Sequence, residues 1–166
     1  MFKSLFGKKE KAAAMENVVS PMTGKVVKLE EVPDPVFSQK MMGDGMAVEP
    51  TEGVVVSPID GEIAQIFPTK HAVGIRGNNG LEILIHIGME TVAMKGEGFE
   101  GHVAEGDKVK AGDKLVTFNL DLVKEKAESI ISPVVITNFD SVASLTKSEE
   151  SSVTREKSVL FQVKMK

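Results

Sequence analysis

The sequence of 166 residues contains no cysteine, tryptophan or tyrosine. The absence of cysteine excludes disulfides, thiolate nucleophiles and cysteine-rich zinc sites. Without tryptophan and tyrosine, most of the aromatic platforms that stack on nucleobases are also missing. The formal net charge of −4 disfavours binding to a phosphate backbone. We therefore expect no nucleic-acid partner.

Long apolar runs are absent as well. No stretch approaches the ~20 residues that a bilayer-spanning helix needs, and the first residues lack the apolar core of a secretory signal. We therefore expect a cytoplasmic protein with one domain over residues 16–166 and a tail over residues 1–15. The tail sets Phe2, Leu5 and Phe6 among lysines. This spacing allows either a solvated tail or a short amphipathic helix, within residues 1–11, on the inner face of the membrane.

From residue 16 onward, short runs rich in valine and isoleucine alternate with glycine, proline and aspartate. Many short strands with frequent turns predict an all-β antiparallel sandwich or barrel. One helix is predicted over residues 121–130 with Asp121 as its N-cap, a helical turn over residues 140–145, and a loop over residues 146–156. The expected strands cover residues 18–19, 25–29, 47–48, 54–56, 62–67, 71–76, 81–87, 114–119, 134–137 and 159–164.

An internal duplication is visible in the sequence. The run VVSPMTGKVVKL at residues 18–29 resembles VVSPIDGEIAQI at residues 55–66, and ISPVV at residues 131–135 is a weaker third copy. Proline fixes φ and glycine permits a positive φ, so Ser-Pro-x-x-Gly predicts a turn between two strands. We expect a duplicated strand-turn-strand motif within one sandwich.

Residues 70–91 predict a β-hairpin that carries two of the three histidines. Asn78 and Asn79 tolerate the backbone of a tight turn. A turn centred on them would pair Arg76 with Leu81, Val73 with Leu84 and His71 with His86. Directly opposed residues share one face of a sheet, so the two imidazole rings should touch.

The alternation in residues 81–88 assigns a face to His86. Leu81, Ile83, Ile85 and Ile87 form one continuous apolar face, and His86 points the other way. A single histidine in a strand is usually only tolerated there, but two cationic imidazoles would repel, so a facing pair indicates a functional site. Two histidines supply only two zinc ligands, and no triad supports hydrolysis. A nucleophilic imidazole that attacks phosphorus beside a stabilising one remains.

Several segments resemble the glucose-family enzyme IIA of the bacterial phosphoenolpyruvate-dependent sugar phosphotransferase system. They are VPDPVFSQKMMGDGMAVEP (32–50), SPIDGEIAQIFPTKHAVGI (57–75), EILIHIGMETVAMKGEGF (82–99) and EGDKVKAGDKLVTFNL (105–120). The run H-x-G-x-[DE]-T-V at residues 86–92 is the most specific piece. The resemblance extends from about residue 18 to the C-terminus.

This resemblance implies that His86 accepts a phosphoryl group, that His71 assists without being phosphorylated, and that Thr69 orients His71. The partner HPr would donate the phosphoryl group, which comes ultimately from phosphoenolpyruvate. His86 would pass it to a cysteine on a sugar-specific IIB domain of a permease. The resemblance implies an all-β fold, which agrees with the strand pattern. We expect a monomer that needs no cofactor of its own and that could also regulate other proteins.

A phosphohistidine must be shielded from water, so apolar residues should surround His86 and dock its partners. Methionine suits a surface that meets several partners, because it is flexible and polarizable. Asp34 and Glu90 could meet basic residues of a partner. The residues that match the apolar docking rim of the family are Val36, Phe37, Met41, Met42, Phe67, Leu84 and Val92.

Two alternatives stay open. Ala93-Met94-Lys95 and GDKVKAGDKL at residues 106–115 resemble biotinyl and lipoyl domains, which would make the chain a swinging-arm carrier modified at Lys95. Gly96 follows where those domains have methionine, and such domains are roughly half as long. In addition, His71 and His86 could hold an intermolecular zinc ion if a partner supplied a carboxylate.

Overall fold

The computed structural model describes residues 15–166, and most of their regular elements are strands. The predicted amphipathic segment within residues 1–11 lies outside the described residues. Helices are α2 (Pro35–Ser38) and α3 (Leu120–Lys126), with 3₁₀ turns η1 (Leu29–Glu31), η2 (Thr91–Met94) and η3 (Phe139–Ser141). The strands are β1 (Glu16–Val19), β2 (Gly24–Lys28), β3 (Gly45–Pro50), β4 (Val54–Val56), β5 (Gly61–Ile66), β6 (Ala72–Gly77), β7 (Glu82–His86), β8 (Phe99–Gly101), β9 (Lys108–Val109), β10 (Lys114–Phe118), β11 (Ser132–Ile136), β12 (Val142–Lys147), β13 (Ser152–Val153) and β14 (Val159–Met165).

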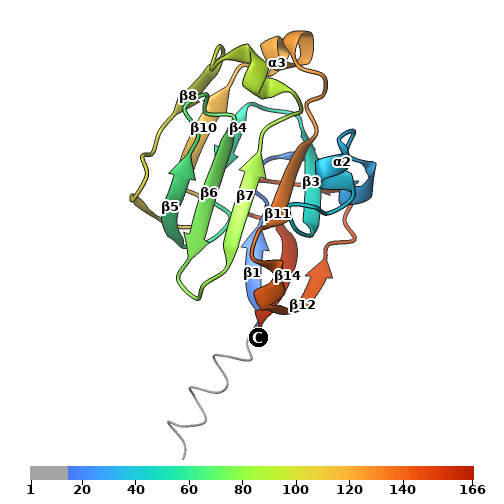
Figure 1. Ribbon diagram of the computed structural model, residues 1–166, viewed down its shortest axis with the longest axis vertical. Coiled ribbons are helices and arrows are strands. Elements are labelled where there is room, and N and C mark those ends of the chain that lie inside the picture. The colour runs from blue at the N-terminus through green and yellow to red at the C-terminus, as the bar shows by residue number, and fades with distance from the viewer. Residues whose placement is uncertain (1–14) are drawn as a thin grey trace, which may run out of the picture.

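The strands form one long sheet and two short ones, all antiparallel in the described residues. The long sheet has the order β13-β2-β3-β11-β7-β6-β5-β9, and the short sheets have the orders β1-β14-β12 and β4-β10-β8. In Figure 1, β7 points to the upper end of the molecule, where α3 lies, and the C-terminus is at the lower end. The predicted all-β sandwich is confirmed. No helix among the described residues has the length and hydrophobicity to span a bilayer.

The two faces of the long sheet bury separate apolar clusters. The main core lies between the long sheet and the two short sheets, and includes Ile83 and Ile85 of β7. The second cluster lies on the opposite face and includes Leu84 of the same strand, with Phe37 of α2. Strand alternation therefore splits β7 as its sequence predicts. His86, which shares the face of Leu84, belongs to the second side.

The duplicated motif is present as two interlocked turns. The Ser20 and Ser57 hydroxyls each donate to the backbone carbonyl two residues on, at 2.7 Å. The backbone N–H of Val19 donates to the carbonyl oxygen of Pro58, and the N–H of Val56 donates to the carbonyl oxygen of Pro21. Each turn thus satisfies a backbone group of the other.

The glycine of each motif has a different purpose from the predicted one. Gly24 and Gly61 are not among the glycines with positive φ. Instead, a Cβ at Gly24 would lie 2.1 Å from the carbonyl oxygen of Glu49, and one at Gly61 would lie 2.2 Å from that of Arg76. Close approach of the neighbouring strand, rather than backbone conformation, requires glycine at both positions.

The predicted register of the hairpin is wrong by one residue. Arg76 pairs with Glu82, Val73 pairs with Ile85, and Ala72 rather than His71 pairs with His86. The loop contains three residues, 78–80, and Gly80 takes the left-handed conformation with φ of 95°. A three-residue loop of this kind is a common alternative to the two-residue turn. Val73 therefore lies in the main core.

Three local predictions need correction. The helix predicted over residues 121–130 is α3, which covers Leu120–Lys126. Its N-cap is Asn119 rather than Asp121, and the Asn119 side chain accepts from the Leu122 N–H. The helical turn predicted over residues 140–145 is limited to η3 at residues 139–141, and the rest belongs to strand β12, which pairs with β14. The expected loop over residues 146–156 contains β13, which pairs with β2.

We predict that Gly24→Ala and Gly61→Ala each lower the free energy of unfolding by about 2–3 kcal/mol, because the added methyl group overlaps a backbone oxygen. Gly74→Ala is the matched control, since a Cβ there has no neighbour nearer than 4.0 Å. Urea denaturation checks this. Equal unfolding midpoints for all three variants would contradict the close-approach explanation.

Candidate functional site

Two imidazole rings form the centre of the site. His86 is the last residue of β7, and His71 immediately precedes β6. Their ring centroids are 5.1 Å apart and the planes are inclined by 81°, an edge-to-face contact. The predicted contact between the rings is therefore present, although the predicted register is wrong.

The loop before β6 explains how His71 reaches His86. Strand alternation would send His71 to the same face as Val73, but His71 lies just outside the strand. Lys70 has a left-handed backbone with φ of 63°. Its N–H donates to the carbonyl oxygen of Phe67, which closes a tight turn. The His71 carbonyl still accepts from the Ile87 N–H at 2.7 Å. The backbone thus continues the ladder, while the ring lies beside His86.

A backbone carbonyl fixes the tautomer of His86. Nδ1 of His86 lies 2.8 Å from the carbonyl oxygen of Gly88. A carbonyl oxygen can only accept, so Nδ1 carries the proton. In the neutral ring, Nε2 then has a free lone pair and can act as a nucleophile.

The second ring is held by a hydroxyl. Thr69 Oγ1 is hydrogen-bonded to Nδ1 of His71. His71 itself is only 5% exposed, and Phe67 packs edge-on against its ring at a centroid distance of 5.4 Å. Thr69 and Phe67 therefore restrict the ring from two sides, which leaves its orientation well determined.

Both imidazoles are held in the neutral state. Burial, with a smaller contribution from the neighbouring His86, lowers the pKa of His71 from 6.5 to about 4. Burial also lowers the pKa of His86, although its bond to Gly88 and the negative charges of Asp34 and Glu90 oppose that shift. Two neutral rings can touch without the repulsion that two cations would have.

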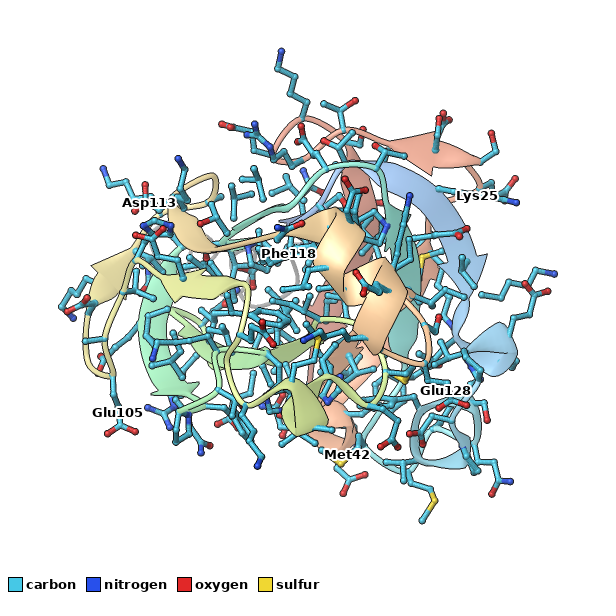
Figure 2. The ribbon with its side chains drawn as sticks, turned by 90° about the horizontal axis from the view of Figure 1, so that it is seen from above. Lys25, Met42, Glu105, Asp113, Phe118 and Glu128 are labelled. Atoms are coloured by element: carbon cyan, nitrogen blue, oxygen red, sulfur yellow. The ribbon has the colours of Figure 1, made fainter. Side chains whose placement is uncertain are left out.

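The predicted docking rim consists of a buried part and an exposed part. Phe37 packs on the His86 ring at a centroid distance of 5.1 Å, and Leu84 is also buried. Outside them, Met41 and Val92 are 68% and 54% exposed, and Val36 and Met42 are exposed as well. Figure 2, seen from the α3 end, shows Met42 at the molecular margin. Exposed apolar side chains beside a reactive group are typical of a docking surface.

The two predicted acidic residues occupy different positions. Asp34 caps α2, and its carboxylate accepts from the Val36 N–H at 2.9 Å. Glu90 is exposed and has a left-handed backbone with φ of 62°. Both lie close enough to His86 to influence its pKa. Their contact with a partner stays a prediction.

The sequence over residues 16–142 matches the family described as phosphoenolpyruvate-dependent sugar phosphotransferase system, EIIA 1. The chain belongs to this EIIA family. It is 57% identical over 166 residues to the glucose-specific EIIA component of Bacillus cereus, covering 100% of both chains. It is 50% identical to that of Staphylococcus aureus strain Mu50, covering 99% of both.

A solved structure shows the same fold. The glucose permease IIA from Mycoplasma capricolum superposes with a TM-score of 0.85 and 40% sequence identity, covering 90% of this chain and 96% of that one. EIIA proteins are phosphotransfer components of a phosphoenolpyruvate-dependent sugar phosphotransferase system.

Two open alternatives can be placed within the EIIA fold. Lys95, the residue of the swinging-arm alternative, is exposed and has a left-handed backbone with φ of 56°, directly after η2.

No group of three or more histidine or acidic side chains in residues 15–166 is placed to hold a metal ion. His71 and His86 offer two nitrogens, so the predicted zinc site would need further ligands from a partner. It stays a prediction.

The sequence did not reveal the residues that position the His86 ring through hydrogen bonds. Gly88 supplies the carbonyl that fixes the tautomer, and buried Thr91 and Ser132 bond to the peptide before it. Gly88 and Thr91 are fixed positions of the H-x-G-x-[DE]-T-V run, so that run marks them. Ser132 belongs to the third copy of the Ser-Pro motif, which gave no hint of this role.

We predict that His71 makes the protein acid-sensitive. Because its pKa is lowered on folding, the stability it contributes is present above pH 6.5 and is lost as the pH falls to about 4. At ~1.4 kcal/mol per unit, the loss is on the order of 3 kcal/mol. In urea denaturation, His71→Gln should lose correspondingly less stability over this pH range. Equal losses for both proteins would contradict the burial of a neutral imidazole.

Proposed function

We propose that the chain is a phosphohistidine carrier that accepts a phosphoryl group from HPr on His86 and transfers it to the cysteine of a sugar-specific IIB domain. The observation that carries this proposal is the hydrogen bond from His86 Nδ1 to the Gly88 carbonyl. It assigns the free lone pair to Nε2. The names of the relatives support glucose as the sugar.

The chemistry requires one bond to form as another breaks. The Nε2 lone pair of His86 attacks phosphorus while the bond between phosphorus and the donor breaks, and the donor recovers the electron pair. Delivery is the same exchange, with the IIB thiolate as nucleophile and Nε2 as leaving group. The lowered pKa of His86 supports acceptance, because a protonated Nε2 could not attack.

His71 has the placement of a stabilising group. If the Thr69 hydroxyl donates to Nδ1, Nε2 of His71 carries the proton and can donate to a phosphoryl oxygen. The ring contact of 5.1 Å to His86 supports this role. A hydrogen-bond donor aimed at the charge that develops in transfer lowers the barrier. Thr69 would then act by fixing both the orientation and the tautomer of His71.

The docking rim supports transfer between proteins. Exposed Val36, Met41, Met42 and Val92 offer apolar area around buried His71 and Phe37. A partner that covers them would exclude water from the phosphohistidine during transfer. Asp34 and Glu90 would meet basic residues of HPr or of the IIB domain. We expect a monomer without a cofactor of its own, which acts in the cytoplasm and could also regulate other proteins through this surface.

The deciding experiment is incubation with phosphoenolpyruvate, enzyme I and HPr, followed by mass spectrometry. An acid-labile phosphoryl group on His86 is the expected product. Biotin or lipoate on Lys95 of the protein purified from cells would instead support the swinging-arm carrier.

We predict that His86→Ala abolishes phosphorylation, because no other nitrogen with this environment can replace Nε2. His102→Gln is the control, since His102 is exposed and bonds to Thr117. Radiolabel transfer from HPr measures both. Undiminished labelling of His86→Ala would refute the assignment of the acceptor.

We predict that His71→Gln still accepts the phosphoryl group but delivers it to the IIB domain about 100-fold more slowly or worse, the usual cost of losing one stabilising donor. Stopped-flow or quench measurements with phosphorylated protein and IIB check the rate. Normal acceptance together with normal delivery would remove His71 from the mechanism.

A further inference from the structure

Two buried hydroxyls hold the peptide group between Ile87 and Gly88. The Ile87 carbonyl accepts from Thr91 Oγ1 at 2.6 Å. The Gly88 N–H donates to Ser132 Oγ at 3.0 Å, and that hydroxyl donates in turn to the Ile130 carbonyl at 2.9 Å. Thr91 and Ser132 are both fully buried. Both ends of this peptide are therefore fixed by side chains rather than by a strand partner.

The next peptide group carries the carbonyl that meets His86. The Met89 N–H donates to the Ser129 carbonyl at 2.8 Å, and the Gly88 carbonyl accepts from His86 Nδ1 at 2.8 Å. In a trans peptide the N–H and C=O point in opposite directions. Fixing the N–H on Ser129 thus aims the C=O at His86.

Gly88 joins these two peptide groups through a left-handed backbone. Its φ is 68°, and a Cβ there would lie 2.8 Å from the Ser129 carbonyl oxygen and 2.9 Å from Thr91 Cγ2. Glycine allows the turn but does not hold it, because glycine is the most flexible residue. The hydroxyls of Thr91 and Ser132 supply the restraint that glycine lacks.

We propose that Ser132 and Thr91 are positioning residues that hold Gly88 so that its carbonyl keeps His86 in the Nδ1–H tautomer. Without these two hydroxyls, the Gly88 carbonyl could turn away from His86 Nδ1, and the proton of His86 could move to Nε2. That nitrogen would then have no lone pair for phosphorus. The consequence for transfer, though not the tautomer itself, rests on the proposed function.

The duplicated motif supports this assignment by contrast. Ser20 and Ser57 donate to carbonyls within their own turns, two residues further along the chain. Ser132 occupies the same place in the third copy, but its hydroxyl bonds backward to Ile130 and also accepts from distant Gly88. The Ser132 hydroxyl thus contacts a segment distant in the sequence, which the other two hydroxyls do not, and Ser57 is a matched control of equal burial.

The test compares Ser132→Ala and Thr91→Val with Ser57→Ala. The ¹⁵N shifts of the imidazole nitrogens, measured by NMR on the unphosphorylated full chain, distinguish protonated from unprotonated nitrogen. Wild type and Ser57→Ala should show His86 protonated at Nδ1. Ser132→Ala and Thr91→Val should each show a shift towards the Nε2–H tautomer, even though Ser57→Ala loses a buried hydroxyl as well.

The rate of phosphorylation by HPr should follow the tautomer. Loss of one hydrogen bond predicts a decrease of about fivefold in each variant, and Ser132→Thr, which keeps the hydroxyl, should recover most of it. A wild-type tautomer ratio in both Ser132→Ala and Thr91→Val would overturn the proposal. If the tautomer shifts but wild type is never phosphorylated on His86, the positioning role stands and the proposed function fails.

Discussion

The edge-to-face contact between His71 and His86 is the constraint on which the site depends. Two imidazoles whose centroids are 5.1 Å apart cannot both be cationic without strong repulsion. Burial removes that problem by keeping both rings neutral near pH 7. Burial in turn needs the second apolar cluster, which includes Phe37 and Leu84 on the outer face of the long sheet. The pair of neutral imidazoles thus needs an apolar surface that a simple one-core sandwich would not have.

Neutrality alone does not make a nucleophile, because a neutral imidazole has two tautomers. The Gly88 carbonyl settles this for His86, because it can only accept, whereas the Thr69 hydroxyl that is bonded to Nδ1 of His71 can either donate or accept. Both partners lie in irregular backbone just outside a strand, where left-handed residues such as Lys70 and Gly88 occur. The strands therefore bring the rings together, and the loops supply the hydrogen-bond partners of both Nδ1 atoms.

The sequence predicted the features that depend on long patterns and missed those that depend on single residues. The alternation in residues 81–88 correctly placed Ile83 and Ile85 in the core, because burial acts on every second residue. The register failed because two- and three-residue loops share the same Asn and Gly composition. Strand β12 was missed because its pairing with β14 overrides a weak local preference for helix. The predicted contact between the rings is present despite the wrong register. The turn at Lys70 places His71 outside strand β6, so strand alternation does not determine the direction of its ring.

The interlocked Ser-Pro turns have a consequence for how the two copies of the motif depend on one another. Val19 relies on Pro58 for its acceptor, and Val56 relies on Pro21. A polypeptide with only one copy would lack this acceptor for its own N–H, and a second copy of the same molecule could supply it. The duplication thus joins covalently what would otherwise be the two halves of a symmetric dimer interface.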